Sequence, residues 1–249
     1  MSYPTTSISS FVPPYTHPAT VLPALRQQGF ALLPAADVCA LSGAPIQELQ
    51  ALNPSWNHLL PDTYLKDGGR YRKRRHSCYV VQADSVERTA HRAHWQPLEY
   101  NALHGGMERW FEPIDASTQT PAWSALLRWL GSVASGVRAP QPWYVEAHQF
   151  RIDTEGGIGR PTPEGAHRDG VDLVAVFLVG REGVKGGETR VFDAAGPSGQ
   201  RFTLTEPWSL LLLDDARMIH ETTPIQPTSD TAHRDTLVVT LRAGGFQGA

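Results

Sequence analysis

The second half of the chain is a series of short apolar runs separated by glycine, proline and charged residues. Runs of about four to eight residues, bounded in this way and rich in branched and aromatic side chains, predict buried strands. We expect strands over 143–153, 171–180, 188–193, 201–204, 208–213 and 235–242. Residues 141–245 are therefore predicted to form the core of a β-sheet structure.

The first half has a helical pattern instead, with apolar residues three or four positions apart. We expect a helix over 21–28 closed by Gly29, a strand over 30–34, a helix over 45–59, and a helix from Pro121 to Leu130 capped by Thr120. Residues 1–20, rich in Ser, Thr and Pro, are expected to form an extended arm, and residues 21–140 a helix-rich buttress.

Helices followed by strands predict a mainly β fold with flanking helices (α+β), such as a jelly roll. The chain has 249 residues, of which 41% are hydrophobic. All-β folds often reach about 200–250 residues as one unit, so we interpret 1–249 as a single domain. 

Charge and cysteine content exclude several classes of protein. The formal net charge is −3 and gives no basic surface for nucleic acid or anionic membrane. No apolar run reaches the ~18 residues of a membrane span, and the polar start does not resemble a secretory signal. The two cysteines, Cys39 and Cys78, are too few for a disulfide framework. We expect a cytoplasmic protein.

Candidate chemistry lies at the start of one predicted strand, in the segment Gly165-Ala-His-Arg-Asp-Gly170. Side chains two residues apart on a strand point to the same face, so His167 and Asp169 should project together. His220 follows a later apolar run and a turn, and is expected to lie across from them. The letters Ala-His-Arg-Asp recur at 232–235, but no histidine follows that second copy.

Two neutral imidazoles and one carboxylate on one face leave three positions of an octahedral ion open. This set, His167, Asp169 and His220, is typical of mononuclear non-heme Fe(II) oxygenases. A bidentate oxo-acid and O2 could occupy the open positions.

Beyond the triad, the chain resembles the iron(II)/2-oxoglutarate-dependent dioxygenases, in particular the bacterial branch that includes L-isoleucine 4-hydroxylase. The matching stretches are 161–170, 186–190, 211–221 and 234–238, and, further upstream, 100–109 and 111–114. The resemblance covers residues 70–243 and includes Asn101 and Arg109, to which we assign no role.

The resemblance implies a double-stranded β-helix that uses Fe(II), 2-oxoglutarate as cosubstrate and O2, with His167, Asp169 and His220 as iron ligands. It also implies a basic residue after the distal histidine that anchors the far carboxylate of 2-oxoglutarate. Arg234 meets this expectation, with Arg242 as the alternative, and a guanidinium suits a carboxylate because it can bind both oxygens. Halogenating relatives lack the carboxylate that Asp169 provides, so hydroxylation is the expected outcome. The expected substrate is a small molecule, a free L-amino acid.

Substrate and cosubstrate contacts are predicted from strand parity. Gln149 and Arg151 lie two apart on the strand before the metal motif and could line the pocket mouth, with Arg151 pairing a substrate carboxylate. Thr189 could approach the cosubstrate. The basic run 69–76 is interpreted as a charged turn before a strand at 77–81, although one of its arginines could reach a carboxylate.

Two alternatives remain at this level. One is a cupin-like metal enzyme that does not use 2-oxoglutarate, such as an isomerase. Such enzymes prefer several histidine ligands, and Asp169 counts against them. The other is a non-catalytic jelly-roll binding protein, which an intact triad together with Arg234 disfavours.

Overall fold

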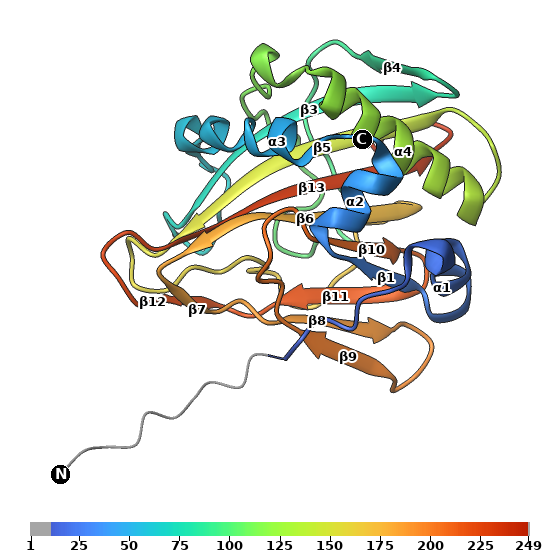
Figure 1. Ribbon diagram of the computed structural model, residues 1–249. Helices are drawn as coiled ribbons and strands as arrows, with labels where there is room; N and C mark the ends of the chain where they lie inside the picture. Colours follow the sequence, from blue (N-terminus) through green and yellow to red (C-terminus); the bar gives the residue numbers. More distant parts are fainter. Residues whose placement is uncertain (1–10, 249) are drawn as a thin grey trace.

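In the computed structural model, which describes residues 11–248, the largest element is an antiparallel sheet of eight strands (Figure 1). The strand order is β1-β10-β6-β13-β5-β3-β2, and β4 pairs with the free edge of β3. The strands are β1 (Phe30–Leu33), β2 (Leu60–Pro61), β3 (Arg72–Gln82), β4 (Ser85–Arg88), β5 (Trp143–Asp153), β6 (Leu173–Glu182), β10 (Leu210–Asp214) and β13 (His233–Ala243).

A smaller sheet lies across from the large one and completes a jelly roll (Figure 1). It consists of β11 (Met218–Thr222), β8 (Thr189–Asp193) and β9 (Gly199–Phe202), and a two-stranded ribbon of β7 (Val184–Gly186) and β12 (Ile225–Pro227) extends beside it. Leu178 of β6, Val191 of β8 and Phe202 of β9 belong to one buried cluster that holds the two sheets together. The prediction of a mainly β fold with flanking helices is confirmed.

The helices cover the outer face of the large sheet (Figure 1). They are α1 (Val21–Gln28), α2 (Ala35–Ser42), α3 (Ile46–Gln50) and α4 (Pro121–Val137), with short 3-10 turns at Pro18–Thr20, Asn53–His58 and Ala116–Thr118. Trp123 of α4 shares a buried apolar cluster with Val145 and Ala147 of β5. The odd-numbered residues of β5 therefore face the helices, which leaves the even-numbered ones for the space between the sheets.

Several expected elements differ in detail. The helix expected over 45–59 is divided into α3 and a 3-10 turn, because Pro54 at the start of that turn cannot continue an α-helical ladder. Residues 72–76 of the basic run lie within β3, which therefore begins earlier than the strand expected over 77–81. The strand expected over 30–34 is present as β1, whereas β2 and β4 were not expected in the helix-rich segment. Residues 1–10 of the expected arm lie outside the described residues.

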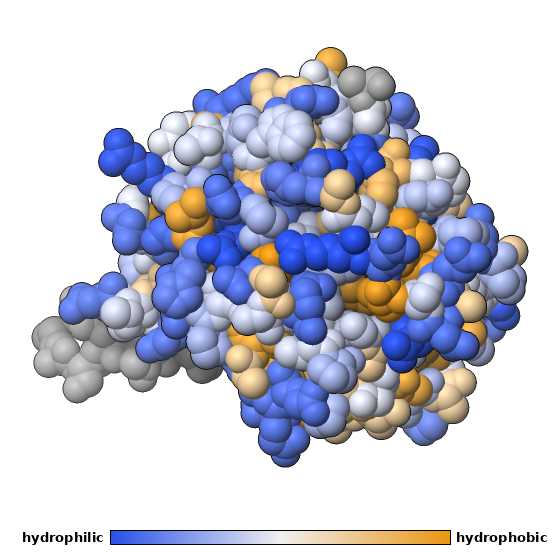
Figure 2. Space-filling model, turned by 90° about the horizontal axis from the view of Figure 1, so that it is seen from above, coloured by the Kyte–Doolittle hydropathy of each residue, from blue (hydrophilic) through white to orange (hydrophobic). Residues whose placement is uncertain are grey.

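The exterior is chemically mixed. Hydrophilic side chains dominate the face shown in Figure 2, and hydrophobic ones occur among them in small groups. Across the described range, no helix is both long enough and apolar enough to cross a bilayer.

Candidate active site

A cavity lies between the two sheets and contains the predicted metal ligands. Together with the open space at its mouth, it encloses about 1060 Å³. Its walls include the inward-facing residues of β5 and β13, namely Tyr144, Glu146, His148, Phe150, Ile152, Arg234, Thr236, Val238, Thr240 and Arg242.

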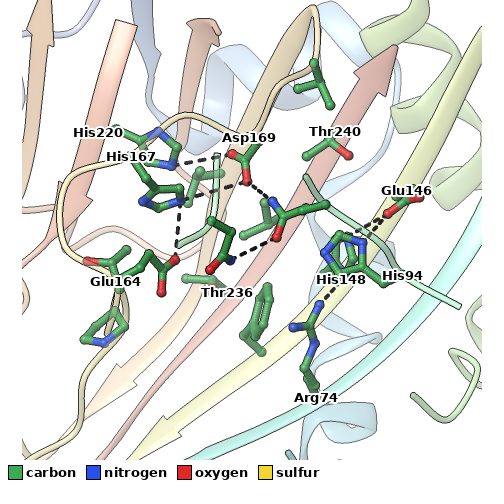
Figure 3. A pocket seen from close by; sticks show the side chains of 18 of the residues that line it. Arg74, His94, Glu146, His148, Glu164, His167, Asp169, His220, Thr236 and Thr240 are labelled. Atoms are coloured by element: carbon green, nitrogen blue, oxygen red, sulfur yellow. Dashed lines mark hydrogen bonds and ion pairs between the residues drawn. The ribbon is translucent and has the colours of Figure 1, made fainter. Parts of the chain in front are cut away.

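The structure brings His167, Asp169 and His220 together, as the sequence predicts (Figure 3). His167 and His220 form an isolated antiparallel bridge, with N–H to carbonyl distances of 3.0 and 2.9 Å, so their imidazoles lie side by side. Nε2 of His167 is 3.9 Å from Oδ1 of Asp169, and Nε2 of His220 is 3.8 Å from Oδ2. One donor atom from each residue can therefore face a common point.

The tautomer of His167 suits metal binding. Its Nδ1 lies 3.0 Å from the carbonyl oxygen of Gly165, which can only accept a hydrogen bond. Nδ1 therefore carries the proton, and the lone pair of Nε2 is directed towards Asp169. A backbone carbonyl that accepts a hydrogen bond from the other ring nitrogen commonly orients a metal-binding histidine.

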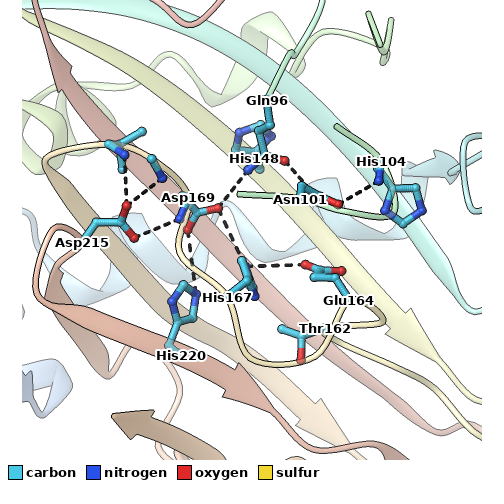
Figure 4. A network of polar contacts seen from close by, with 12 residues as sticks. Gln96, Asn101, His104, His148, Thr162, Glu164, His167, Asp169, Asp215 and His220 are labelled. Carbon is cyan, nitrogen blue, oxygen red and sulfur yellow. Dashed lines mark hydrogen bonds and ion pairs between the residues drawn. The ribbon is translucent and has the colours of Figure 1, made fainter. Parts of the chain in front are cut away.

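Two further residues hold Asp169 in place (Figure 4). Asp215, which follows β10, accepts hydrogen bonds from the backbone N–H groups of Asp169, Gly170 and Val171 at 2.7–3.0 Å. Gln96 donates from Nε2 to Oδ1 of Asp169 at 3.2 Å. Sequence reasoning assigned no role to either residue: Asp215 lies in a stretch that resembles the family, whereas Gln96 lies in an irregular loop with no periodic signal.

The electrostatics of the triad favour a bound cation. Burial lowers the pKa of His220 well below its usual range, with a smaller contribution from His167. Burial also lowers the pKa of His167, but Asp169 and Glu164 outweigh that effect and raise it overall. Burial raises the pKa of Asp169. These side chains are at most 16% exposed and lie close together, so a divalent ion would offset the solvation that burial removes.

Arg234 lies in the same cavity and is 3% exposed. It forms no ion pair with any described residue, and its Nε has no hydrogen-bond partner. Burial lowers its pKa to about 10, with Arg181 as the next cause. A buried guanidinium without an anion is costly, so this position suits the carboxylate of a ligand. Arg242 lines the cavity at the other end of β13 and donates to the carbonyl of Gly245 at 2.7 Å.

Other predicted contacts lie elsewhere. Gln149 and Arg151 are on the helix-facing side of β5 and do not line the cavity. The prediction that they lie at the pocket mouth is therefore wrong. Gln149 donates to Oγ of Ser55 at 2.8 Å. Arg151 binds Asp235 through two hydrogen bonds of 2.8 and 2.6 Å. Thr189 is buried on β8 and is also absent from the cavity wall.

Two arginines of the basic run do reach the cavity, because alternate residues of β3 point inwards. Arg72 and Arg74 line the wall and share one carboxylate, Asp62, at 2.8 and 3.8 Å. The intervening Lys73 lies 3.1 Å from Asp153, outside the cavity wall. The interpretation of this run as a charged turn is therefore wrong for residues 72–76.

A second cluster of possible metal ligands consists of His76, His94, Glu146 and His148. The last three of these residues line the same cavity (Figure 3). All three imidazoles approach Oε2 of Glu146, at 3.4, 2.6 and 3.5 Å. Arg74 lies 2.8 Å from Nδ1 of His148 and can only donate. Nε2 of His148 therefore carries the proton and donates to Glu146, so this nitrogen is not free to bind a metal.

Comparison with known proteins agrees with this geometry. The family model described as 2OG-Fe dioxygenase matches residues 53–240. This chain belongs to the 2OG-Fe dioxygenase family. It is an Fe(II)- and 2-oxoglutarate-dependent enzyme that uses O2. The family therefore excludes both alternatives: a metal enzyme that does not use 2-oxoglutarate, and a non-catalytic binding protein.

Solved structures give the same fold. A BsmA homologue from Methylobium petroleophilum is 57% identical, with a TM-score of 0.90 over 95% of this chain and 97% of that one. A protein called IDO from Bacillus thuringiensis is 19% identical, with a TM-score of 0.73 over 92% of this chain and 97% of that one. The Fe(II)/α-ketoglutarate-dependent dioxygenase TqaL is 20% identical, with a TM-score of 0.68 over 93% and 90%. No curated protein matched the chain.

Proposed function

We propose that this dioxygenase hydroxylates a free L-amino acid, with His167, Asp169 and His220 as the ligands of its iron. One observation carries the assignment: the triad and the unpaired Arg234 line the same cavity. The triad offers two nitrogen donors and one carboxylate, the set that suits Fe(II) with open positions. O2 is the oxidant of the reaction: 2-oxoglutarate is oxidised to succinate and CO2 with one oxygen atom, the substrate C–H bond is oxidised to C–OH with the other, and bound Fe(II) would supply the site of O2 activation.

Arg234 binds the distal carboxylate of 2-oxoglutarate in this proposal. Its planar guanidinium can pair both oxygens of that carboxylate, and the surrounding protein excludes the water that would screen the pair. Asp169 is positioned by Asp215 and Gln96, so a ligand carboxylate is already oriented before the metal binds. A carboxylate at position 169 also favours hydroxylation, because the space needed by a halide ligand is filled.

A small, charged substrate fits the cavity wall. Apolar side chains such as Val171, Val176 and Val238 lie among buried charged groups. An aliphatic amino acid presents the same combination, with an apolar side chain on a zwitterionic end. Free Cys39 and Cys78 fit a cytoplasmic location, which is part of the proposal.

A panel of the free amino acids, supplied with Fe(II), ascorbate and 2-oxoglutarate, tests this function. Succinate formation should rise well above the rate without substrate for one or more aliphatic amino acids. Mass spectrometry should show the gain of one oxygen atom in the same amino acid. A panel in which no amino acid raises succinate formation, while a peptide, acyl ester or nucleobase does, would overturn the substrate class.

A further inference from the structure

Arg109 is a second buried guanidinium without an acidic partner in the cavity. It is 2% exposed, forms no ion pair with any described residue, and its Nε has no hydrogen-bond partner. Its one side-chain hydrogen bond is from Nη2 to Oε1 of Gln96 at 2.8 Å. Arg72 and Arg74 differ in this respect, because Asp62 already lies beside both.

Arg109 lies close to the metal triad. Gln96 accepts a hydrogen bond from Arg109 through Oε1. It also donates through Nε2 to Oδ1 of Asp169 (Figure 4). Two hydrogen bonds therefore connect the guanidinium to the triad. Asn101 also donates to Oε1 of Gln96, at 3.0 Å, and fixes the amide orientation. The backbone of Arg109 forms an antiparallel bridge with His94, which directs both side chains to the cavity wall.

Glu164 is an acidic group on the same wall. Its side chain is 12% exposed, and its Oε1 lies 3.5 Å from Nε2 of His167. Its Oε2 is buried and has no hydrogen-bond partner (Figure 3). Arg109 and Glu164 both line this cavity, so a ligand inside it can meet both charges. No arginine or lysine among residues 11–248 lies within ion-pair distance of Glu164.

Two fully buried guanidiniums of the cavity, Arg109 and Arg234, therefore lack an anion, whereas Arg242 is only half-buried. At its distal end, 2-oxoglutarate can satisfy only one of the two buried groups. We propose that Arg109 binds the carboxylate of the substrate and Glu164 binds its ammonium group. This inference rests on the proposed function, and it specifies that the substrate is held by both charges of its zwitterion.

Binding measurements without turnover test the assignment. Under anaerobic conditions, with Mn(II) and 2-oxoglutarate bound, the dissociation constants of three compounds are compared: an amino acid that stimulates the wild type, its primary amide, and its des-amino carboxylic acid. Arg109→Gln should raise the dissociation constants of the amino acid and of the des-amino acid by at least ~30-fold each. The amide, which has no carboxylate, should bind wild type and variant equally.

Glu164→Gln should show the opposite selectivity. The amino acid and its amide should lose affinity, whereas the des-amino acid should bind as well as it does to the wild type. Arg128→Gln is a matched control, because Arg128 contacts only the carbonyl of Asp84 at 3.0 Å, far from the cavity wall. Arg109→Lys keeps the positive charge but cannot bind both carboxylate oxygens in one plane, so its affinity for the amino acid should be intermediate.

Three results would overturn the inference. One is an unchanged affinity for the amino acid in Arg109→Gln. Another is an equal loss of affinity for the amino acid and for its amide in Arg109→Gln, which would mean that Arg109 only maintains the structure of the cavity. The third is a melting temperature or an affinity for 2-oxoglutarate that falls in parallel with the substrate affinity. Failure of the proposed function is distinguishable, since the wild type itself would then respond to no amino acid.

Discussion

Nη2 of Arg74 donates a hydrogen bond to Nδ1 of His148 at 2.8 Å, which fixes the tautomer of that histidine. Arg74 itself packs between Phe111 and Phe150, with its guanidinium 3.8 and 4.4 Å from their ring centroids. Its position is therefore set by several contacts, and His148 is held as a donor to Glu146. The cluster of three histidines around Glu146 is a hydrogen-bonded carboxylate site, although its composition resembles a metal site.

We therefore predict one tightly bound metal ion per chain. Anaerobic titration with Fe(II), followed by metal analysis, should give a stoichiometry of one, and His94→Gln should bind the same amount. A stoichiometry of two that falls to one in His94→Gln would show that the Glu146 cluster binds metal.

Removal of a triad imidazole should abolish metal binding while the protein stays folded. His167→Ala and His220→Ala each leave two ligands, which is too few to hold Fe(II) at an open site. Iron content and succinate formation should both fall to background, with unchanged circular dichroism. Retention of iron and turnover in both variants would place the site elsewhere, and His233, 3.6 Å from Asp235, would be the next residue to test.

Arg234→Leu should weaken the binding of 2-oxoglutarate. Loss of one partner of a buried charged pair costs roughly 2–5 kcal/mol, which corresponds to at least ~30-fold in the apparent affinity. The measurement is the 2-oxoglutarate dependence of succinate formation. Arg242→Leu serves as the comparison, and a larger loss there would transfer the anchor to Arg242.

Acid should destabilise the protein through the Glu146 cluster. Burial lowers the pKa of His94 to about 3, and burial also lowers the pKa values of His76 and His148. In the unfolded chain these histidines take up protons near pH 6.5, whereas the folded protein keeps them neutral. The neutral histidines therefore stabilise the folded protein fully above about pH 6.5. As the pH falls below that value, the free energy of unfolding decreases by up to about 1.4 kcal/mol per pH unit for each imidazole.

Urea unfolding between pH 7.5 and 5 measures this effect. The free energy of unfolding should depend less steeply on pH in His94→Gln than in the wild type. His58→Gln replaces an exposed histidine and should keep the wild-type slope. Equal slopes in wild type and His94→Gln would contradict the explanation.

The triad could be predicted from the sequence because its geometry is local. His167 and Asp169 are two residues apart beside a buried strand, and His220 follows the strand that pairs with it. The sequence also predicts which residues of a strand share a face, but it does not predict whether that face points to the cavity or to the helices. Gln149 and Arg151 share a face as expected, yet that face packs on helices. A shift of one residue, to His148 and Phe150, would have selected the cavity side.

The remaining site residues depend on long-range contacts. Gln96 and Arg109 belong to a loop without hydrophobic periodicity. Only the folded chain shows that Gln96 contacts Asp169 and that Arg109 contacts Gln96. The basic run was misread for a related reason: Arg72 and Arg74 are buried because Asp62, on the neighbouring segment, compensates their charge. A pattern of like charges in one segment does not reveal a partner from another.

Incorporation of ¹⁸O2 tests the central claim most directly. With Fe(II), 2-oxoglutarate and an amino acid that stimulates turnover, one labelled oxygen atom should appear in succinate and one in the hydroxylated amino acid. Neither product should form in His220→Ala. Unlabelled succinate and product from the wild type, or labelled products from His220→Ala, would contradict the account of this enzyme as an amino-acid dioxygenase whose iron is held by His167, Asp169 and His220.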